Sequence, residues 1–376
     1  MAGIYLHIPF CHQACTYCDF HFVTSFGRKE EMVKAIQQEL RLRKEFFPVG
    51  TTLETIYFGG GTPSVLSQKE LASILETIYK HFSVADEAEV TLEANPEDID
   101  SEKLNQWKKA GINRLSIGIQ SFHDEHLKWM NRLHTGEQAM GSLRMAQQAG
   151  IENITIDLIM GIPEMSQGQW EENLSKACSL GTPHMSVYAL TVEPKTALFH
   201  QVKKQLVRLP EEEDVSWQFL KTHEWLTATG YQHYEISNYS LVGQHSRHNS
   251  SYWDRKAYLG IGPSAHSFLE NNRSWNIANN AKYLQALAQE ELPTAETEVL
   301  ETSDVYHEYV MTGLRKANGI SDQWVKYHMG FSLKEKFSEE IRSWEVKGLC
   351  HWEGDQLSLT PEGWIIADHL ITELFL

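Results

Sequence analysis

The sequence predicts an α/β fold whose first half contains a parallel β-sheet. Six segments rich in Ile, Val, Leu, Tyr or Thr have the character of strands, and they span 4–9, 55–59, 89–94, 114–120, 155–160 and 185–190. Between them, apolar residues recur at three- and four-residue spacing, which is typical of helices over 30–46, 68–81, 101–110, 137–149 and 169–180. Strands that alternate with helices form parallel sheets with right-handed crossovers, so the pattern fits an open sheet or an incomplete barrel.

The pattern changes after about residue 200. A helix over 211–229 is followed by expected strands at 231–239 and 258–268. Helices dominate from 303 onward, and a hairpin over 349–359 precedes a last helix over 361–375. Helices followed by a short hairpin and a further helix resemble a winged-helix module. We therefore expect a barrel in 1–200, a barrel-completing and connecting region in 201–300, and a mainly helical, winged-helix-like C-terminal domain in 301–376.

The composition is that of an ordinary globular protein with an acidic surface. Lys and Arg number 33 against 50 Asp and Glu, which gives a net charge of −17 over 376 residues. Such a charge repels phosphate backbones, and no basic patch interrupts it, so a nucleic-acid partner is disfavoured. The sequence contains no apolar run long enough for a transmembrane helix and no secretory signal, so we expect a cytoplasmic location.

Three of the five cysteines crowd together directly after the first expected strand. Cys11, Cys15 and Cys18 lie on one short loop, where their thiolates can converge on one metal centre. Three cysteines on a cubane cluster leave one iron without a protein ligand. The alternative is a zinc site completed by His12 or His21, although structural zinc sites normally take four ligands from paired motifs. Cys178 and Cys350 stand alone and are expected to be buried cysteines without a metal.

Polar and glycine residues follow the expected strands at their carboxyl ends, where β/α folds bind their ligands. Gly60 and Gly61, followed by Thr62, permit a close backbone approach and leave N–H groups free for a carboxylate. Four further polar residues lie at or just beyond strand ends: Glu93, Gln120, Arg132 and Asp157. Each alone reads as a structural polar residue, whereas their shared location favours a binding site.

The cysteine loop resembles the signature of the radical S-adenosylmethionine (SAM) superfamily, Cys-x-x-x-Cys-x-aromatic-Cys, with Tyr17 in the aromatic position. The resemblance implies a [4Fe-4S] cluster on Cys11, Cys15 and Cys18, whose open iron is chelated by SAM. It also implies one-electron cleavage of SAM to methionine and a 5′-deoxyadenosyl radical. In such proteins the cofactors supply the chemistry, and the protein supplies positioning and water exclusion.

A narrower resemblance runs through the first half of the chain. The segments 5–11, 57–63, 92–96, 117–122 and 157–163 are similar, in order, to the family of oxygen-independent coproporphyrinogen III oxidases and haem chaperones. The likeness implies a partial (β/α)6 TIM-type barrel with a smaller C-terminal domain. It also implies SAM contacts at the matching positions, which are Tyr5, Tyr17, Gly60, Gly61, Thr62, Glu93, Gln120, Arg132, Asp157 and Ala189.

Three features favour the haem-chaperone branch of this family. The chain reaches Tyr5 without the N-terminal extension of the oxidases, and Phe20 occupies the place of their fourth cysteine. The segment His248-Asn249-Ser-Ser-Tyr252-Trp253 matches the His-Asn-x-x-Tyr-Trp motif associated with haem binding in the chaperones. A histidine nitrogen can ligate haem iron, and aromatic side chains can pack on a porphyrin. His245 and His266 remain alternative ligands to His248.

The resemblance therefore implies a haem chaperone that binds haem as cargo, together with a [4Fe-4S] cluster and SAM. It implies delivery of haem to apo-haemoproteins of the respiratory chain, and it is compatible with peripheral membrane contact and with a homodimer. Whether SAM is turned over by such a protein stays open, and no catalytic residue is assigned. The alternative hypothesis is an oxygen-independent coproporphyrinogen III oxidase, which decarboxylates its substrate oxidatively to protoporphyrinogen IX.

Overall fold

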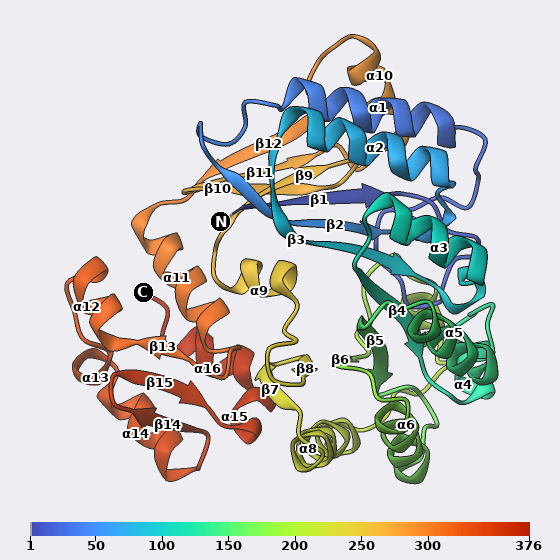
Figure 1. Cartoon of the computed structure of the whole chain (residues 1–376). Helices are drawn as coiled ribbons and strands as arrows, with labels where there is room; N and C mark the ends of the chain where they lie inside the picture. Colours follow the sequence, from blue (N-terminus) through green and yellow to red (C-terminus); the bar gives the residue numbers. More distant parts are fainter. Residues whose placement is uncertain (1) are drawn as a thin grey trace.

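A computed structural model describes residues 2–376, and its centre is a curved sheet of parallel strands (Figure 1). The six strands expected from the sequence are all present and pair in chain order: β1 (Ala2–Ile8), β2 (Thr52–Gly60), β3 (Ser83–Ala94), β4 (Arg114–Gln120), β5 (Asn153–Met160) and β6 (His184–Ala189). Each neighbouring pair is parallel. The expected partial (β/α)6 barrel is confirmed.

Helices cover the convex side of this sheet, and the long ones agree with the apolar periodicity, except that α1 ends at Leu42, four residues before the expected end. They are α1 (Lys29–Leu42), α2 (Gln68–His81), α3 (Ser101–Ala110), α5 (Gly136–Gln148), α6 (Gln167–Ser179) and α8 (Glu212–Ala228). Ser67, Thr135 and Ser166 start three of them with reciprocal capping boxes, which satisfy backbone donors that would otherwise lack partners. Four short helices were not predicted: α4 (Asp124–Trp129), α7 (Ala197–Lys203), α9 (Arg247–Trp253) and α10 (Asn280–Ala288).

The middle of the chain extends the sheet at both edges. At one edge β8 (Asn238–Ser240) pairs antiparallel with β6, and β7 (Gln232–Glu235) follows it. At the other edge β9 (Ala257–Ile261) runs parallel to β1 and is followed in the sheet by β10 (His266–Leu269), β11 (Asn272–Asn276) and β12 (Thr294–Val299). The helix α9 (Arg247–Trp253) lies inside the curve of the sheet (Figure 1), and α10 (Asn280–Ala288) precedes β12.

Two strand expectations in this region are wrong in their extent. The stretch 258–268 is two antiparallel strands, β9 and β10, because the chain turns between them at Gly262 and at Ser264, which have φ of 104° and 66°. The stretch 231–239 is likewise divided into β7 and β8. Strands β11 and β12 were not predicted.

The C-terminal region has the order of elements expected of a winged-helix module. Its elements are α11 (Thr302–Gly313), β13 (Ile320–Ser321), α12 (Asp322–Met329), α13 (Leu333–Lys336), α14 (Ser338–Val346), β14 (Cys350–Glu353), β15 (Gln356–Leu359), α15 (Pro361–Ile365) and α16 (Ala367–Glu373). The three strands form a separate antiparallel sheet in the order β13-β15-β14. The expected single last helix is two, because the chain breaks at Ile366 between α15 and α16.

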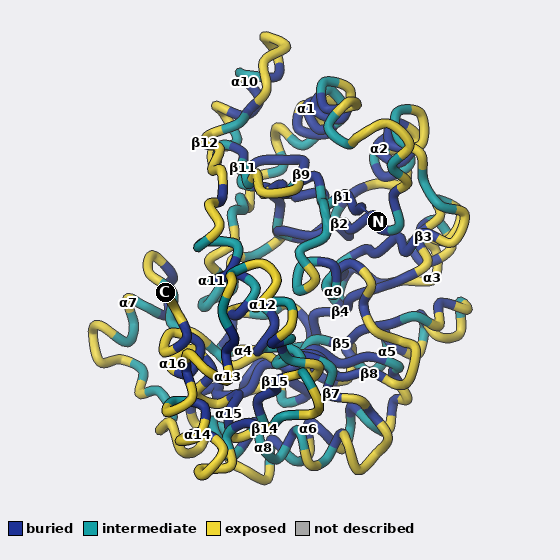
Figure 2. The backbone as a smooth tube through the Cα atoms, turned by 90° about the vertical axis from the view of Figure 1, so that its left-hand side faces the viewer, coloured by how far each residue is buried: buried dark blue, intermediate teal, exposed yellow. Residues whose placement is uncertain are grey.

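Burial follows this layering. The strands of the central sheet are mostly buried, whereas the outward faces of the surrounding helices are exposed (Figure 2). The sheet therefore provides a rigid base for the loops at the carboxyl ends of its strands, which is where parallel sheets bind their ligands. No helix formed by residues 2–376 has both the length and the apolar character needed to cross a bilayer.

Candidate functional site

A cavity of about 500 Å³ opens at the carboxyl ends of β2 to β6, beside the cysteine loop. Its lining brings together residues that lie far apart in the sequence. All the residues predicted to contact SAM except Tyr5 line it, together with the three loop cysteines: Cys11, Cys15, Tyr17, Cys18, Gly60, Gly61, Thr62, Glu93, Gln120, Arg132, Asp157 and Ala189. Tyr5 lines a neighbouring cavity instead.

The loop cysteines are free thiols, and all three line this cavity. Burial raises the pKa of Cys11 to about 11 and that of Cys18 to about 12. Both are therefore protonated in the metal-free protein at neutral pH, and cluster binding must release protons. The Thr62 hydroxyl donates to Cys11 Sγ at 3.3 Å, and Arg132 Nη1 lies 3.5 Å from Cys15 Sγ. These donors favour thiolates at the loop, which fits the ligands of an iron–sulfur cluster.

The histidines of the zinc alternative are engaged elsewhere. His12 Nε2 lies 3.3 Å from Asp98 Oδ1, and His21 Nε2 lies 2.7 Å from Asn280 Oδ1. Within residues 2–376, no three His, Cys, Asp or Glu side chains, the loop cysteines included, are already arranged around the position of a single metal ion. Of the other cysteines, Cys350 is buried as expected, but Cys178 is partly exposed.

The glycine turn after β2 has a steric reason. Gly60 has φ of 105°, and a Cβ on it would lie 2.6 Å from His7 Nδ1. A Cβ on Gly61 would lie 2.8 Å from the carbonyl oxygens of Ile8 and Phe10. Only glycine fits both positions, and the turn keeps the backbone next to the cavity and the cysteine loop.

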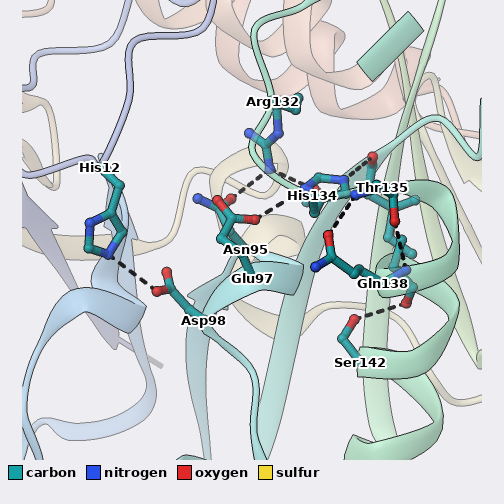
Figure 3. A network of polar contacts seen from close by, with 12 residues as sticks. His12, Asn95, Glu97, Asp98, Arg132, His134, Thr135, Gln138 and Ser142 are labelled. Atoms are coloured by element: carbon teal, nitrogen blue, oxygen red, sulfur yellow. Dashed lines mark hydrogen bonds and ion pairs between the residues drawn. The ribbon is translucent and has the colours of Figure 1, made fainter. Parts of the chain in front are cut away.

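Arg132 joins the cavity to a buried polar network (Figure 3). Its Nη2 donates to Asn95 Oδ1 and to the Gly118 carbonyl, both at 2.7 Å. Nearby, Glu97 Oε2 lies 3.1 Å from His134 Nδ1. Among residues 2–376, the buried Nε of Arg132 has no hydrogen-bond partner. The guanidinium as a whole lines the cavity, so Arg132 is suited to hold a carboxylate there.

Two carboxyl groups sit in the cavity wall with shifted acidity. Burial raises the pKa of Glu93 to about 8. The hydrogen bond that Tyr57 donates to it at 2.8 Å acts in the opposite direction and lowers the pKa, but burial has the larger effect. Burial also raises the pKa of Asp157 to about 6, although hydrogen bonds from Ser186 and Ser116 act in the opposite direction. Without a ligand, Glu93 is therefore mainly protonated at neutral pH. Hydroxyl or ammonium donors from a bound ligand would favour its charged form.

The shifted acidity of Glu93 predicts a pH-dependent stability. The folded-state pKa lies above the ordinary value of 4.5, so the folded protein retains a proton that the unfolded chain releases. This stabilisation is complete below 4.5 and is lost as the pH rises through about 8. We expect the free energy of unfolding of the cofactor-free parent protein to decline between pH 4.5 and about 8, and that of Glu93→Gln to decline less steeply. Urea denaturation at several pH values in this range measures both slopes. An identical slope in parent and variant would contradict the assignment.

The His-Asn-x-x-Tyr-Trp segment forms α9, and its members face different surroundings. His248 is fully buried: its Nδ1 lies 2.7 Å from Thr55 Oγ1 and its Nε2 lies 2.8 Å from the Tyr252 hydroxyl. Burial lowers the pKa of His248 to about 3, so the ring is neutral. Asn249 lines the cavity described above, Tyr252 lines the neighbouring one and Trp253 lines a third. Both nitrogens of His248 are thus engaged within the protein.

Replacing His248 with alanine should therefore destabilise the fold. The change leaves a cavity and deprives Thr55 and Tyr252 of a hydrogen-bond partner, so we expect a loss of about 2 kcal/mol in the free energy of unfolding. Asn249→Ala, one position along the same helix, is the control, because that side chain is only half-buried. Urea denaturation of the two variants measures the difference, and equal losses would mean that His248 is not a structural residue.

Three lining residues were not predicted, and a fourth was predicted for another ligand. Tyr57 donates to Glu93, Asn95 accepts from Arg132, and Tyr188 and Asn249 complete the wall, although Asn249 was expected to contact haem. The first three lie in or next to strands already placed at the site, so their proximity to Glu93, Arg132 and Ala189 was an available signal. The motif singled out Asn249, but no local pattern indicates that its helix lies inside the sheet and brings it to this cavity.

Comparison with known proteins gives a consistent family. The Radical SAM superfamily model matches residues 5–177, and the HemN C-terminal domain model matches residues 300–366. The chain is 34% identical to heme chaperone HemW of Bacillus subtilis, covering 98% of each chain. It is 33% identical to heme chaperone HemW of Mycobacterium tuberculosis, covering 99% of this chain and 94% of the relative.

A solved structure supports the fold. Coproporphyrinogen III oxidase (HemN) from Escherichia coli, a radical SAM enzyme, superimposes with a TM-score of 0.85, covering 99% of this chain and 89% of its own. At 21% identity this likeness shows a shared fold. The full-length similarity to the chaperones is closer in sequence. This chain therefore belongs to the HemW family of the radical SAM superfamily.

Proposed function

We propose that the protein is a haem chaperone that binds haem, a [4Fe-4S] cluster and SAM, and transfers haem to apo-haemoproteins of the respiratory chain. The observation that carries this proposal is the 34% identity to a heme chaperone over 98% of both chains. Membership of the radical SAM superfamily implies the cluster and SAM. The presence of Phe20 where the oxidases have a fourth cysteine, and the motif on α9, agree with the chaperone branch.

The cavity residues have distinct tasks in this proposal. Cys11, Cys15 and Cys18 hold the cluster, which supplies single electrons when bound. The glycine turn and Arg132 hold the methionine end of SAM, and Glu93 accepts hydrogen bonds from its ribose. Tyr17, Gln120, Asp157 and Ala189 complete the SAM site, and Gln120 keeps its side chain at the cavity through a left-handed backbone with φ of 66°.

Haem, as cargo, belongs beside α9 in this proposal. His248 holds Tyr252 in place through their 2.8 Å contact, and Tyr252 faces the cavity next to the cluster loop. Tyr5 lines the same cavity and stacks on Tyr57, with ring centroids 6.1 Å apart. Tyr57 in turn donates to Glu93. A continuous set of aromatic contacts therefore joins the α9 motif to the proposed SAM site.

The test is a haem titration followed by a transfer assay. The anaerobically reconstituted full chain should bind one haem saturably, as followed by the Soret absorbance. It should then load an apo-cytochrome of the respiratory chain faster than it loses haem to apo-myoglobin, which captures only haem that dissociates freely. Equal rates, or no saturable haem binding, would contradict the proposal. Conversion of coproporphyrinogen III by the same preparation would instead favour the oxidase hypothesis.

A further inference from the structure

A second cavity, also of about 500 Å³, lies next to the SAM cavity and shares Asp19 and Phe20 with it. Its walls come from the cysteine loop, from α9, from β9 to β11 and from α11. This volume is within the range of about 300–1,000 Å³ that is typical of small-molecule sites. Of its lining, the sequence analysis named only His266 as an alternative haem ligand, and the cavity itself was not predicted because it is assembled from residues 5–21 and 252–312.

The walls are largely aromatic and apolar. Tyr252, Tyr258 and Phe268 form one side. Phe20 and Met311 project from other elements and are 66% and 38% exposed. Large exposed apolar side chains around a cavity indicate a binding site for an apolar ligand, and aromatic faces suit a flat one.

Three histidines line this cavity, and they differ in whether a ring nitrogen is free. His7 is engaged on both sides, by the His21 carbonyl at 2.7 Å and the Tyr5 hydroxyl at 3.3 Å. His21 uses Nε2 for Asn280. For His266, no hydrogen bond to either nitrogen exists among residues 2–376, and its ring stacks on Trp275 at 5.6 Å. Partial burial lowers the pKa of His266, which keeps the ring neutral, as a metal ligand requires.

Two arginines and two carboxylates line the same cavity: Arg255, Arg273, Asp19 and Glu308. Arg255 and Arg273 both pair with Glu308, and Arg273 Nη1 lies 2.6 Å from Glu308 Oε1. Both guanidinium groups are thus held next to each other by one carboxylate, and Asp19 lies in the wall shared with the SAM cavity. Guanidinium groups bind carboxylates bidentately, so this pair suits the propionates of a porphyrin.

We propose that haem binds in this second cavity, with His266 as the axial ligand of its iron and Arg255 and Arg273 facing its propionates. The inference rests on the proposed chaperone function and names the cargo site within it. His248 acts behind the wall as a positioning residue that orients Tyr252. The shared wall at Asp19 and Phe20 places the cargo beside the cluster loop, so occupancy of one cavity can be sensed in the other.

The test replaces the proposed ligand, His266, and identifies the axial ligand of the haem iron by spectroscopy. Haem is titrated into the anaerobically reconstituted full chain, and the axial ligand is identified by magnetic circular dichroism. The parent chain should show histidine ligation. Losing even an outer partner of a metal ligand typically costs about 10–100-fold in affinity, so His266→Ala should weaken haem binding at least about tenfold. His266→Cys should convert the signal to that of thiolate-ligated haem.

His351→Ala is the matched control, because His351 is an exposed strand histidine in the C-terminal hairpin, away from both cavities. It should bind haem like the parent. Unchanged affinity and histidine ligation in a folded His266→Ala protein would overturn the inference and leave the chaperone function intact. If the parent chain itself binds no haem saturably, the proposed function fails, and this inference fails with it. A haem analogue with esterified propionates should bind the parent more weakly than haem, and Arg273→Ala should reduce that difference.

Discussion

Replacing Cys15 with alanine is expected to abolish assembly of the iron–sulfur cluster completely. Cys15 is the central thiol of the loop, and Arg132 lies 3.5 Å from its sulfur. With two thiolates, two irons of the cubane lack a protein ligand, and the cluster loses its hold on the loop. Iron and sulfide analysis after anaerobic reconstitution, with the broad visible absorbance of the cluster, measures the effect. SAM affinity should fall in the same variant, because the open iron is lost with the cluster.

Cys178→Ala is the control for this experiment. Cys178 is also a partly exposed free thiol, but its sulfur contacts Thr229 at 3.8 Å, away from the cavity. This variant should retain the parent's iron and sulfide. Retention of both in Cys15→Ala would contradict the ligand assignment. About one zinc per chain without sulfide in the parent would favour the zinc alternative.

The fold is expected to survive the loss of Cys15. The residue lies in a loop outside the regular elements, whereas the barrel is held by the buried strands beneath. The far-UV circular dichroism of Cys15→Ala should therefore match that of the parent. A collapse of helical signal would mean that the cluster is needed for folding, as metals are in some small domains.

The barrel was predictable because local signals and the final structure agree. The helix over 101–110 was predicted with the bounds that the structure has. Asp100 caps its start, and Gly111 ends it with φ of 99°. Such start and stop signals act within a few residues, so a single sequence reveals them. The site residues at the carboxyl ends of β2 to β5 follow from this placement, because the sheet geometry brings them together.

The strands beyond β9 were poorly predicted, because long-range contacts determine them. Strand β12 is largely exposed and rich in Thr and Glu, a composition that does not indicate a strand. It forms because β11 offers an edge for pairing. The second cavity was not predicted for the same reason: His266 was named as an alternative haem ligand, but nothing in the sequence links it to Arg273 or Phe20. For His248 the reverse holds: the sequence showed the motif that contains it, but it did not indicate that the side chain is fully buried.

Glu39 attaches these extra strands to the barrel, so we expect its substitution to have a large effect on stability. Apolar periodicity placed Glu39 in a helix, where a glutamate is normally exposed, yet it is fully buried. Its Oε1 accepts from Arg43 at 2.8 Å and from Asn276 at 2.7 Å. Its Oε2 accepts from the Gly262 backbone at 2.9 Å and from Tyr283 at 2.7 Å. One carboxylate on α1 therefore fastens the end of β9, the end of β11 and α10 to the barrel.

Glu39→Ala should lower the free energy of unfolding by about 3–5 kcal/mol, since it leaves the buried Arg43 charge uncompensated. Glu39→Gln should lose less, because an amide retains an acceptor for part of the network. Glu30→Ala on the same helix is the control: that glutamate is 80% exposed and pairs with Lys34, so its loss should cost less than about 1 kcal/mol. Urea denaturation compares the three variants.

The loss of Glu39 should also affect haem binding, because β9, β10 and β11 form a wall of the second cavity. If Glu39 holds these strands in place, Glu39→Gln, which is expected to stay folded, should weaken haem binding while leaving iron and sulfide content unchanged. The three cysteines make no hydrogen bond to the Glu39 network among the described residues, and the loop meets it only through His21, whose Nε2 lies 2.7 Å from Asn280 Oδ1 at the start of α10. A loss of cluster and haem together would mean that the network supports the whole barrel. A Glu39→Ala protein as stable as Glu30→Ala would show that the pairing of β9 with β1 holds the edge strands without the buried carboxylate.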